Sequence, residues 1–191
     1  MNELLQTEIK LEFVRQHCLP SNGWRVYVDI DASEEGRTGG PCKEPESQQR
    51  RDKMKVAAKN IRAELEKLDV TCGGGHKPWC KINGLPFPGD RDIIAFHPQR
   101  KIYLIVEVEG ASSGQPEQKL YRAAGQLICA AGMDLPAGWN QRWLVLAVNG
   151  TTLADSLEKL KALQRLDITG IVVNKNESGK PLFGPALPSI T

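Results

Sequence analysis

The stretch GDRDIIAFHPQRKIYLIVEVEG, residues 89–110, decides the fold of this chain. It holds two apolar segments, 92–96 and 102–110, joined by the turn-forming residues HPQR. So short a connection predicts an antiparallel hairpin, in which the start of the first strand lies level with the end of the second. Asp92 and Glu107 would then meet at one end of a β-sheet.

Alternating helices and strands are predicted on both sides of this hairpin. Before it, an amphipathic segment at 3–18 predicts a helix, and alternating polar and apolar residues at 24–30 predict a strand. After it, the apolar patterns predict a helix at 116–132, a strand at 143–148, a helix at 151–166, a strand at 168–174 and an irregular tail. We therefore expect an α/β fold with one mixed β-sheet flanked by helices on both faces.

The composition is that of an intracellular globular protein. The 191 residues are 40% hydrophobic and 25% charged, which fits a single domain over residues 1–191. No apolar run approaches the roughly 20 residues that cross a bilayer, and the polar, acidic N-terminus is unlike a signal peptide. The five scattered cysteines indicate reduced thiols rather than a disulfide framework. We expect a cytoplasmic protein without a membrane partner.

Positive charge is concentrated in an insertion at residues 32–84. Residues 37–81 hold 11 basic and 6 acidic side chains, a net of +5 in a chain whose total is +2. Within the insertion we predict a helix at about 46–68, followed by a loop at 71–89 that is rich in Gly and Pro. The helix is either a solvated face or a surface that contacts DNA phosphates. Its candidate DNA-binding residues are Arg50, Arg51, Lys53, Lys55, Lys59 and Arg62.

Two glutamates interrupt the most apolar strand. Glu107 and Glu109 are two residues apart, so their side chains leave the same face of the sheet. A buried, unpaired carboxylate is costly, and an ion or a basic partner must offset that cost. Together with Asp90 or Asp92, these oxygen ligands suit Mg²⁺ or Mn²⁺. The alternative is that both glutamates face solvent on an edge strand.

These residues resemble the motif of the PD-(D/E)xK nuclease superfamily, which has the restriction-endonuclease-like fold. In that family an Asp begins one strand, an acidic residue, any residue and Lys end the next strand, and a helix follows. The corresponding segments here are PGDRDIIAF, IVEVEG and PEQKLYRAAGQL. The order helix, three strands, helix, strand also resembles the family core. The resemblance covers residues 3–30 and 85–150 and leaves the basic insertion outside that core.

The resemblance implies a site for Mg²⁺, with Mn²⁺ as a possible substitute. Asp92 would be the first metal ligand, with Asp90 as its rival, Glu107 the second, and the backbone carbonyl of Val108 the third. Further residues that resemble family positions are the helix-borne acid Glu8 and, on the helix after the hairpin, Lys119 and Gln126.

One position departs from the family pattern. The family has Lys where this chain has Glu109. Three explanations stay open: Glu109 acts as a general base or an extra ligand, Lys119 reaches in as a relocated lysine, or the site is inactive.

A zinc site is a weaker interpretation. Cys72, His76 and Cys80 form C-x3-H-x3-C, and Cys42 or His97 could supply a fourth ligand. This spacing is not that of a standard zinc finger, so zinc is not expected.

The sequence favours a metal-dependent endonuclease that hydrolyses phosphodiester bonds of double-stranded DNA. A sequence-specific restriction-type enzyme is the leading hypothesis, acting as a homodimer because one site per chain must cut two strands. A resolvase or repair nuclease is the alternative within the same class. A DNA-binding module that has lost its chemistry, and an interaction protein whose basic helix docks on an acidic partner, are the alternatives from other classes.

Overall fold

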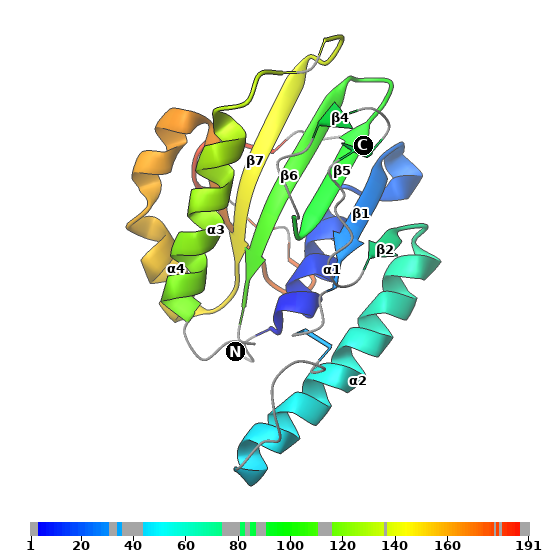
Figure 1. Cartoon of the computed structure of the whole chain (residues 1–191), viewed down its shortest axis with the longest axis vertical. Coiled ribbons are helices and arrows are strands. Elements are labelled where there is room, and N and C mark those ends of the chain that lie inside the picture. The colour runs from blue at the N-terminus through cyan, green and yellow to red at the C-terminus, as the bar shows by residue number, and fades with distance from the viewer. Residues whose placement is uncertain are drawn as a thin grey trace.

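A computed structural model describes residues 4–30, 34–35, 44–73, 81–82, 85–86, 91–110, 116–135, 137–177, 179 and 181–187, with the backbone alone at 81, 82, 85, 86 and 116. Its centre is a seven-stranded mixed sheet in the order β2-β1-β5-β6-β7-β8-β9 (Figure 1). The strands are β1 (Arg25–Asp29), β2 (Thr71–Gly73), β5 (Ile93–His97), β6 (Ile102–Glu109), β7 (Gln141–Val148), β8 (Ile168–Val172) and β9 (Pro181–Phe183). A separate antiparallel pair is formed by β3 (Lys81–Ile82) and β4 (Leu85–Pro86).

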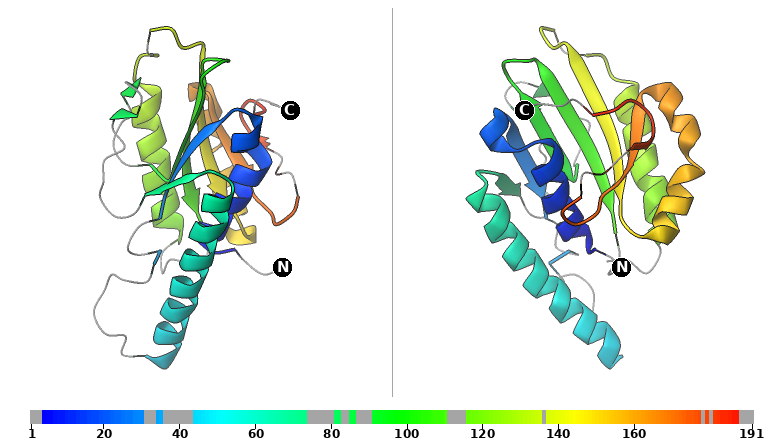
Figure 2. Two further views of the ribbon diagram at one scale, coloured as in Figure 1. Left: turned by 90° about the vertical axis from the view of Figure 1, so that its right-hand side faces the viewer. Right: turned by 180° about the vertical axis from the view of Figure 1, so that it is seen from behind.

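Helices cover both faces of the sheet, as the two further views show (Figure 2). The helices are α1 (Gln6–His17), α2 (Pro45–Lys67), α3 (Pro116–Ala131) and α4 (Thr151–Glu158), with the 3₁₀ turns η1 (Pro20–Asn22) and η2 (Lys161–Leu166). α1 packs on one face, whereas α3 and α4 pack on the other. The predicted mixed α/β sheet flanked by helices is confirmed at this level. Among the described residues, no helix combines the length and apolar character needed to cross a bilayer.

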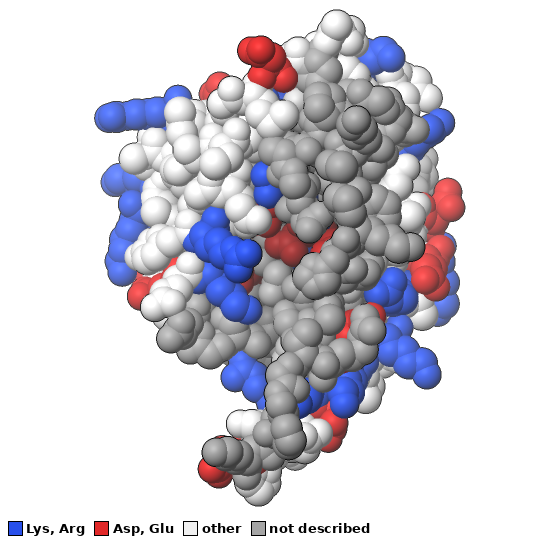
Figure 3. Space-filling view, in the orientation of Figure 1, with Lys and Arg blue, Asp and Glu red and all other residues white. Residues whose placement is uncertain are grey.

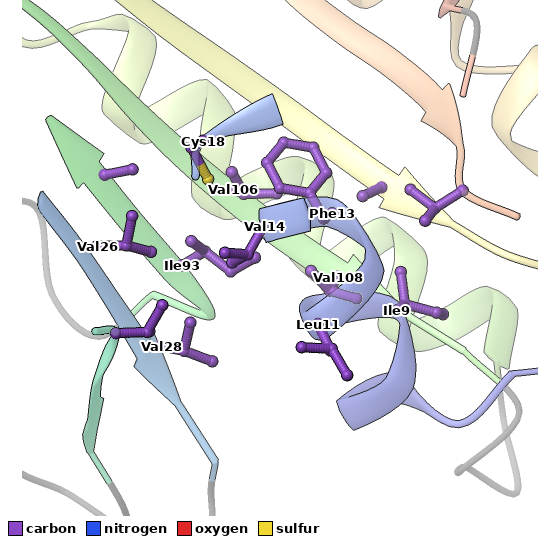
Figure 4. Close-up of a cluster of buried hydrophobic side chains, with 14 of the residues drawn as sticks. Ile9, Leu11, Phe13, Val14, Cys18, Val26, Val28, Ile93, Val106 and Val108 are labelled. Atoms are coloured by element: carbon purple, nitrogen blue, oxygen red, sulfur yellow. The ribbon is translucent and has the colours of Figure 1, made fainter. Parts of the chain in front are cut away.

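Each face of the sheet buries its own hydrophobic cluster. On the first face, Phe13 and Val14 of α1 pack over a layer of strand residues that includes Val106 and Val108 (Figure 4). On the second face, the apolar side of α3 covers residues such as Ile105, which alternates with Val106 along β6. The two clusters fix β6 between helices and hold its carboxyl end in place.

The β5–β6 hairpin has the register that the sequence predicts. Ile93 lies opposite Val106 in an antiparallel pair, so the position of Asp92 is level with that of Glu107. On its other side β6 runs parallel to β7 as far as Glu109. β6 is therefore an interior strand, and the edge-strand alternative for Glu107 and Glu109 is wrong.

Several shorter elements differ from the prediction. The predicted loop at 71–89 contains β2, which joins the main sheet beside β1, so the insertion is not wholly outside the sheet. The tail expected to be irregular contains β9, paired with β8. The single helix predicted at 151–166 is divided, because the chain tightens into η2, where Leu163 packs on the core.

Helix α2 buries few of its residues. Its buried residues are Ala58 and Leu65, both in its second half. The N-terminal half projects away from the sheet (Figure 1). Its helical character comes from residues of high helix propensity rather than from a wide apolar stripe.

Candidate active site at the carboxyl end of β6

The candidate site lies at the start of β5 and the end of β6, where the last residues of β6 extend beyond the first residue of β5. Asp92 immediately precedes β5, and its Oδ2 accepts a hydrogen bond from the backbone N–H of Val108 at 2.8 Å. Because the N–H and C=O of one extended residue point to the same edge of a strand, the carbonyl of Val108 faces the side from which Asp92 approaches. The backbone of Val108 and the side chain of Asp92 therefore meet at the end of the hairpin, level with Glu107.

Asp92 and Glu107 form a close carboxylate pair. Burial, and then the negative charge of Asp92, raise the pKa of Glu107 well above its ordinary range. Arg91 partly offsets this charge, with its Nη1 at 3.2 Å from Oε1 of Glu107, and both side chains are buried. A cation at this point would offset the negative charge of the two carboxylates.

Lys10 is the central residue among those that sequence reasoning missed, the others being Glu34 and Arg91. It comes from α1 and is fully buried, at 0% exposure. Its Nζ lies 2.6 Å from Oδ1 of Asp92 and 2.7 Å from Oε2 of Glu34, and it donates to the backbone carbonyl of Asp29 at 2.6 Å. Burial alone would lower the pKa of Lys10, but Asp92 and Glu34 outweigh it and raise the pKa above its ordinary value. The ammonium therefore keeps its charge inside the fold.

A signal for Lys10 was present in the sequence. It stands between Ile9 and Leu11, in the part of the first helix that is otherwise apolar. A lone cation among buried positions needs an anionic partner, for the same reason that applies to Glu107 in β6. Glu34 gave no such signal, because it lies in a polar loop where a charged residue is ordinary.

Glu109 lies beside the pair rather than in solvent. It is 8% exposed, and burial, followed by the charge of Asp92, raises its pKa to about 7. Lys119, half-buried on α3, and Lys10 act in the opposite direction on the pKa of Glu109. The structure thus brings Lys119 into electrostatic range of the carboxylates while leaving Lys10 as the lysine in direct contact with Asp92.

Other predicted residues have different surroundings. Oε2 of Glu8 accepts a hydrogen bond from the N–H of Leu5, so Glu8 caps the start of α1. Gln126 is half-buried on α3, and its backbone carbonyl accepts a hydrogen bond from Arg91 at 3.4 Å. Asp90 lies outside the described residues.

The described members of the zinc set have their own local contacts. His97 donates through Nε2 to the carbonyl of Asn22 at 3.1 Å, and its Nδ1 accepts from the N–H of Arg100. Cys72 is on β2, while Cys42, His76 and Cys80 lie outside the described residues.

Basic side chains flank the acidic centre. Figure 3 shows acidic side chains recessed near the middle of one face, with Lys and Arg over α3 on one side and along α2 on the other. The basic residues of α3 are Lys119 and Arg122, three residues apart and so on one side of the helix. The predicted DNA-binding residues of α2 fall on two sides: Arg51, Lys55, Lys59 and Arg62 on one, and Arg50 and Lys53 on the other.

The first of these two sides is connected to the site. Arg62 donates to Glu35 at 2.9 Å and to the carbonyl of Gly73. Glu35 follows Glu34, the partner of Lys10. The short segment 34–35 therefore joins this side of α2 to the carboxylates.

The donor set fits one magnesium ion. No group of three or more His, Cys, Asp or Glu side chains in the described part of the chain could hold a metal by side chains alone. Mg²⁺, however, is usually held by one or two carboxylates, with waters and substrate phosphate completing the octahedron. Asp92 and Glu107, with the carbonyl of Val108, meet that requirement.

Comparisons of the chain with protein-family models, with curated proteins and with solved structures found no match.

Proposed function

We propose that this chain is a Mg²⁺-dependent endonuclease of double-stranded DNA with a restriction-endonuclease-like fold. The observation that carries the proposal is the meeting of Asp92 and Glu107, from the two strands of one hairpin, at a point that also receives the buried cation Lys10. The element order α1, β1, β5, β6, α3, β7 agrees with the family core. The proposal covers Mn²⁺ as a substitute ion and a homodimer as the cutting form.

In this proposal Asp92, Glu107 and the carbonyl of Val108 hold the metal ion. When bound, Mg²⁺ would lower the pKa of a water molecule and neutralise charge that develops on the phosphate. Glu109, which is close to the pair, would be the general base at this site. Lys119 lies on the α3 side, where its charge can face a phosphate oxygen. No lysine at position 109 is then required.

The two basic surfaces give the duplex a place beside this site. Basic side chains of α2 and of α3 lie on opposite sides of the acidic centre (Figure 3). Contacts from both sides to phosphates would hold the scissile bond over the carboxylates, independently of sequence. Sequence-specific cutting would require base contacts as well, for which Arg50, Arg51 and Lys55 are the candidates.

The proposal is tested by incubating the full chain with plasmid DNA at low salt, in Mg²⁺, Mn²⁺ or EDTA. The variants Asp92→Asn and Glu107→Gln remove a negative charge while keeping the shape of the side chain. In both, the rate of metal-dependent cleavage is expected to be at least 100-fold lower than in the wild type. Glu64→Gln, an exposed carboxylate that pairs with Arg15 on the surface, is the control and should cut like the wild type.

The form of the products separates the nuclease types. Discrete fragments support a restriction-type enzyme, and a metal-dependent smear supports a resolvase or repair nuclease. Cleavage that survives both substitutions would contradict the site.

A DNA-binding module without catalysis is the second candidate, and one contact favours it. Lys10 uses its three hydrogen-bond donors on Asp92, Glu34 and the carbonyl of Asp29, so the first metal ligand is already neutralised. This candidate predicts DNA binding that EDTA does not alter and no cleavage with any divalent ion.

A further inference from the structure

The ammonium of Lys10 has the surroundings of a bound cation. Three oxygens, from Asp92, Glu34 and the backbone of Asp29, lie 2.6–2.7 Å from Nζ, and the side chain is fully buried. We propose that Lys10 is the resident cation of the site and that a divalent ion competes with it for Asp92. The inference rests on the proposed metal site, but it concerns how that site is occupied rather than which bond is cut.

Competition follows from the way Asp92 is held. Its Oδ1 contacts Nζ of Lys10 and lies 3.4 Å from Nε2 of Gln6, while its Oδ2 accepts from the N–H of Val108. Both oxygens already have partners inside the fold. A divalent ion bound to either oxygen would lie within a few ångströms of a positive charge that water does not screen, and two such charges repel strongly.

Lys10 has partners other than Asp92 that can stabilise its charge. If its contact with Asp92 lengthens, Nζ keeps Glu34 and the carbonyl of Asp29 as partners. The exchange therefore leaves no buried ion unpaired, which would otherwise cost several kcal/mol. Lys10 then neutralises Glu34, while the arriving ion faces Asp92 and Glu107, the second of which also keeps its ion pair with Arg91.

This arrangement predicts weak metal binding that strengthens when Lys10 is removed. The variant Lys10→Met keeps the length of the side chain without its charge. The affinity for Mn²⁺ is expected to rise at least about tenfold, because the repulsion at Asp92 disappears. The double variant Lys10→Met/Glu34→Gln removes one positive and one negative charge. It therefore leaves no unpaired Glu34 carboxylate that could unfold the protein. Its affinity should still rise about threefold, because Lys10 contacts Asp92 directly.

Isothermal titration of Mn²⁺ and of Mg²⁺ into the full chain measures this, with circular dichroism to verify folding. The matched control is Lys67→Met/Glu64→Gln, which removes an exposed ion pair of 3.1 Å on α2 and should stay within twofold of the wild type. Equal affinity in the wild type and both Lys10 variants would overturn the competition and leave the metal site standing. Failure of every variant to bind either ion would overturn the competition together with the metal site.

A second measurement observes the lysine itself. Saturating Mg²⁺ is expected to shift the ¹³Cε resonance of Lys10, assigned by its loss in Lys10→Met, while that of Lys67 stays in place. Bound Mg²⁺ with an unmoved Lys10 signal would refute the exchange.

Discussion

At the scale of single residues, Asn149 joins three segments that are far apart in the sequence. Its Oδ1 accepts from the N–H of Leu4 at 2.7 Å, and its Nδ2 donates to the carbonyl of Val173 at 2.7 Å. We expect Asn149→Ala to lower the free energy of unfolding by about 3 kcal/mol, because two buried backbone groups lose their partners. Urea denaturation measures the change. Asn140→Ala, which removes an exposed bond to the carbonyl of Arg100, should cost less than about 1 kcal/mol.

His17 makes the stability of the fold sensitive to acid. Burial lowers its pKa to about 4, and its Nε2 is buried without a hydrogen-bond partner. In the unfolded chain the imidazole has its ordinary pKa of about 6.5, so between these values the unfolded state binds the extra proton. The stabilisation is present above pH 6.5 and is lost as the pH falls towards 4, by up to about 3 kcal/mol.

The variant His17→Phe tests this assignment. Phe keeps a ring against Phe13, whose ring centroid lies 4.8 Å from that of His17, but it cannot be protonated. The difference in unfolding free energy between the variant and the wild type should therefore grow in favour of the variant between pH 6.5 and 4. A constant difference across this range would exclude His17 as the cause.

The site could be predicted from the sequence only where a residue was unusual for its surroundings. Glu107 stood out in an apolar strand, and the short turn placed Asp92 level with it. Lys10 carried the same kind of signal, but its partners, Glu34 and the carbonyl of Asp29, come from other segments and could not be inferred from spacing. Which lysine lies nearest the carboxylates is decided by packing of α1 on the sheet.

At the scale of elements, two glycines should respond oppositely to the same substitution. Gly125 lies in the middle of α3, where a methyl group added to its Cα would meet open space, so Gly125→Ala should stabilise the chain by about 0.5–1 kcal/mol. At Gly170 in β8 an added Cβ would overlap the ring of Phe183. Gly170→Ala should therefore displace β9 and destabilise the chain by about 1–3 kcal/mol. Thermal unfolding of both variants tests the opposite signs.

The elements that the sequence predicts well are those with a strong local pattern. The β5–β6 hairpin and α3 have long apolar periodicities, and their ends agree with the prediction within one or two residues. β2 and β9 have three residues each, too few for a period, and each exists because a neighbouring strand offers hydrogen-bond partners. Such strands depend on the assembled sheet.

At the scale of the whole molecule, charge distribution matters more than the net charge of +2. The double variant Lys55→Ala/Lys59→Ala removes two exposed cations from one side of α2. If both contact phosphates, the slope of log affinity against log salt should fall by about 2. Lys159→Ala/Lys161→Ala, at the end of α4 and the start of η2, removes the same charge and should leave the slope nearly unchanged. Fluorescence anisotropy with a labelled duplex measures both, and equal slopes in the two variants would argue against the α2 surface.

Hydrogen bonds join α1 and the residue before it to segments that are made much later, and this has a consequence for folding during synthesis. Leu4 is held by Asn149, Gln16 donates to the carbonyl of Asn174 and accepts from the N–H of Gly179, and Glu12 accepts from Asn176. A nascent chain emerges from the ribosome N-terminus first, at roughly 5–20 residues per second. The contacts of α1 with residues 149 and 174–179 therefore form only after those residues have been made. The partners of Lys10, at residues 29, 34 and 92, are made earlier, so the lysine can meet its carboxylates before the ends of α1 are fixed.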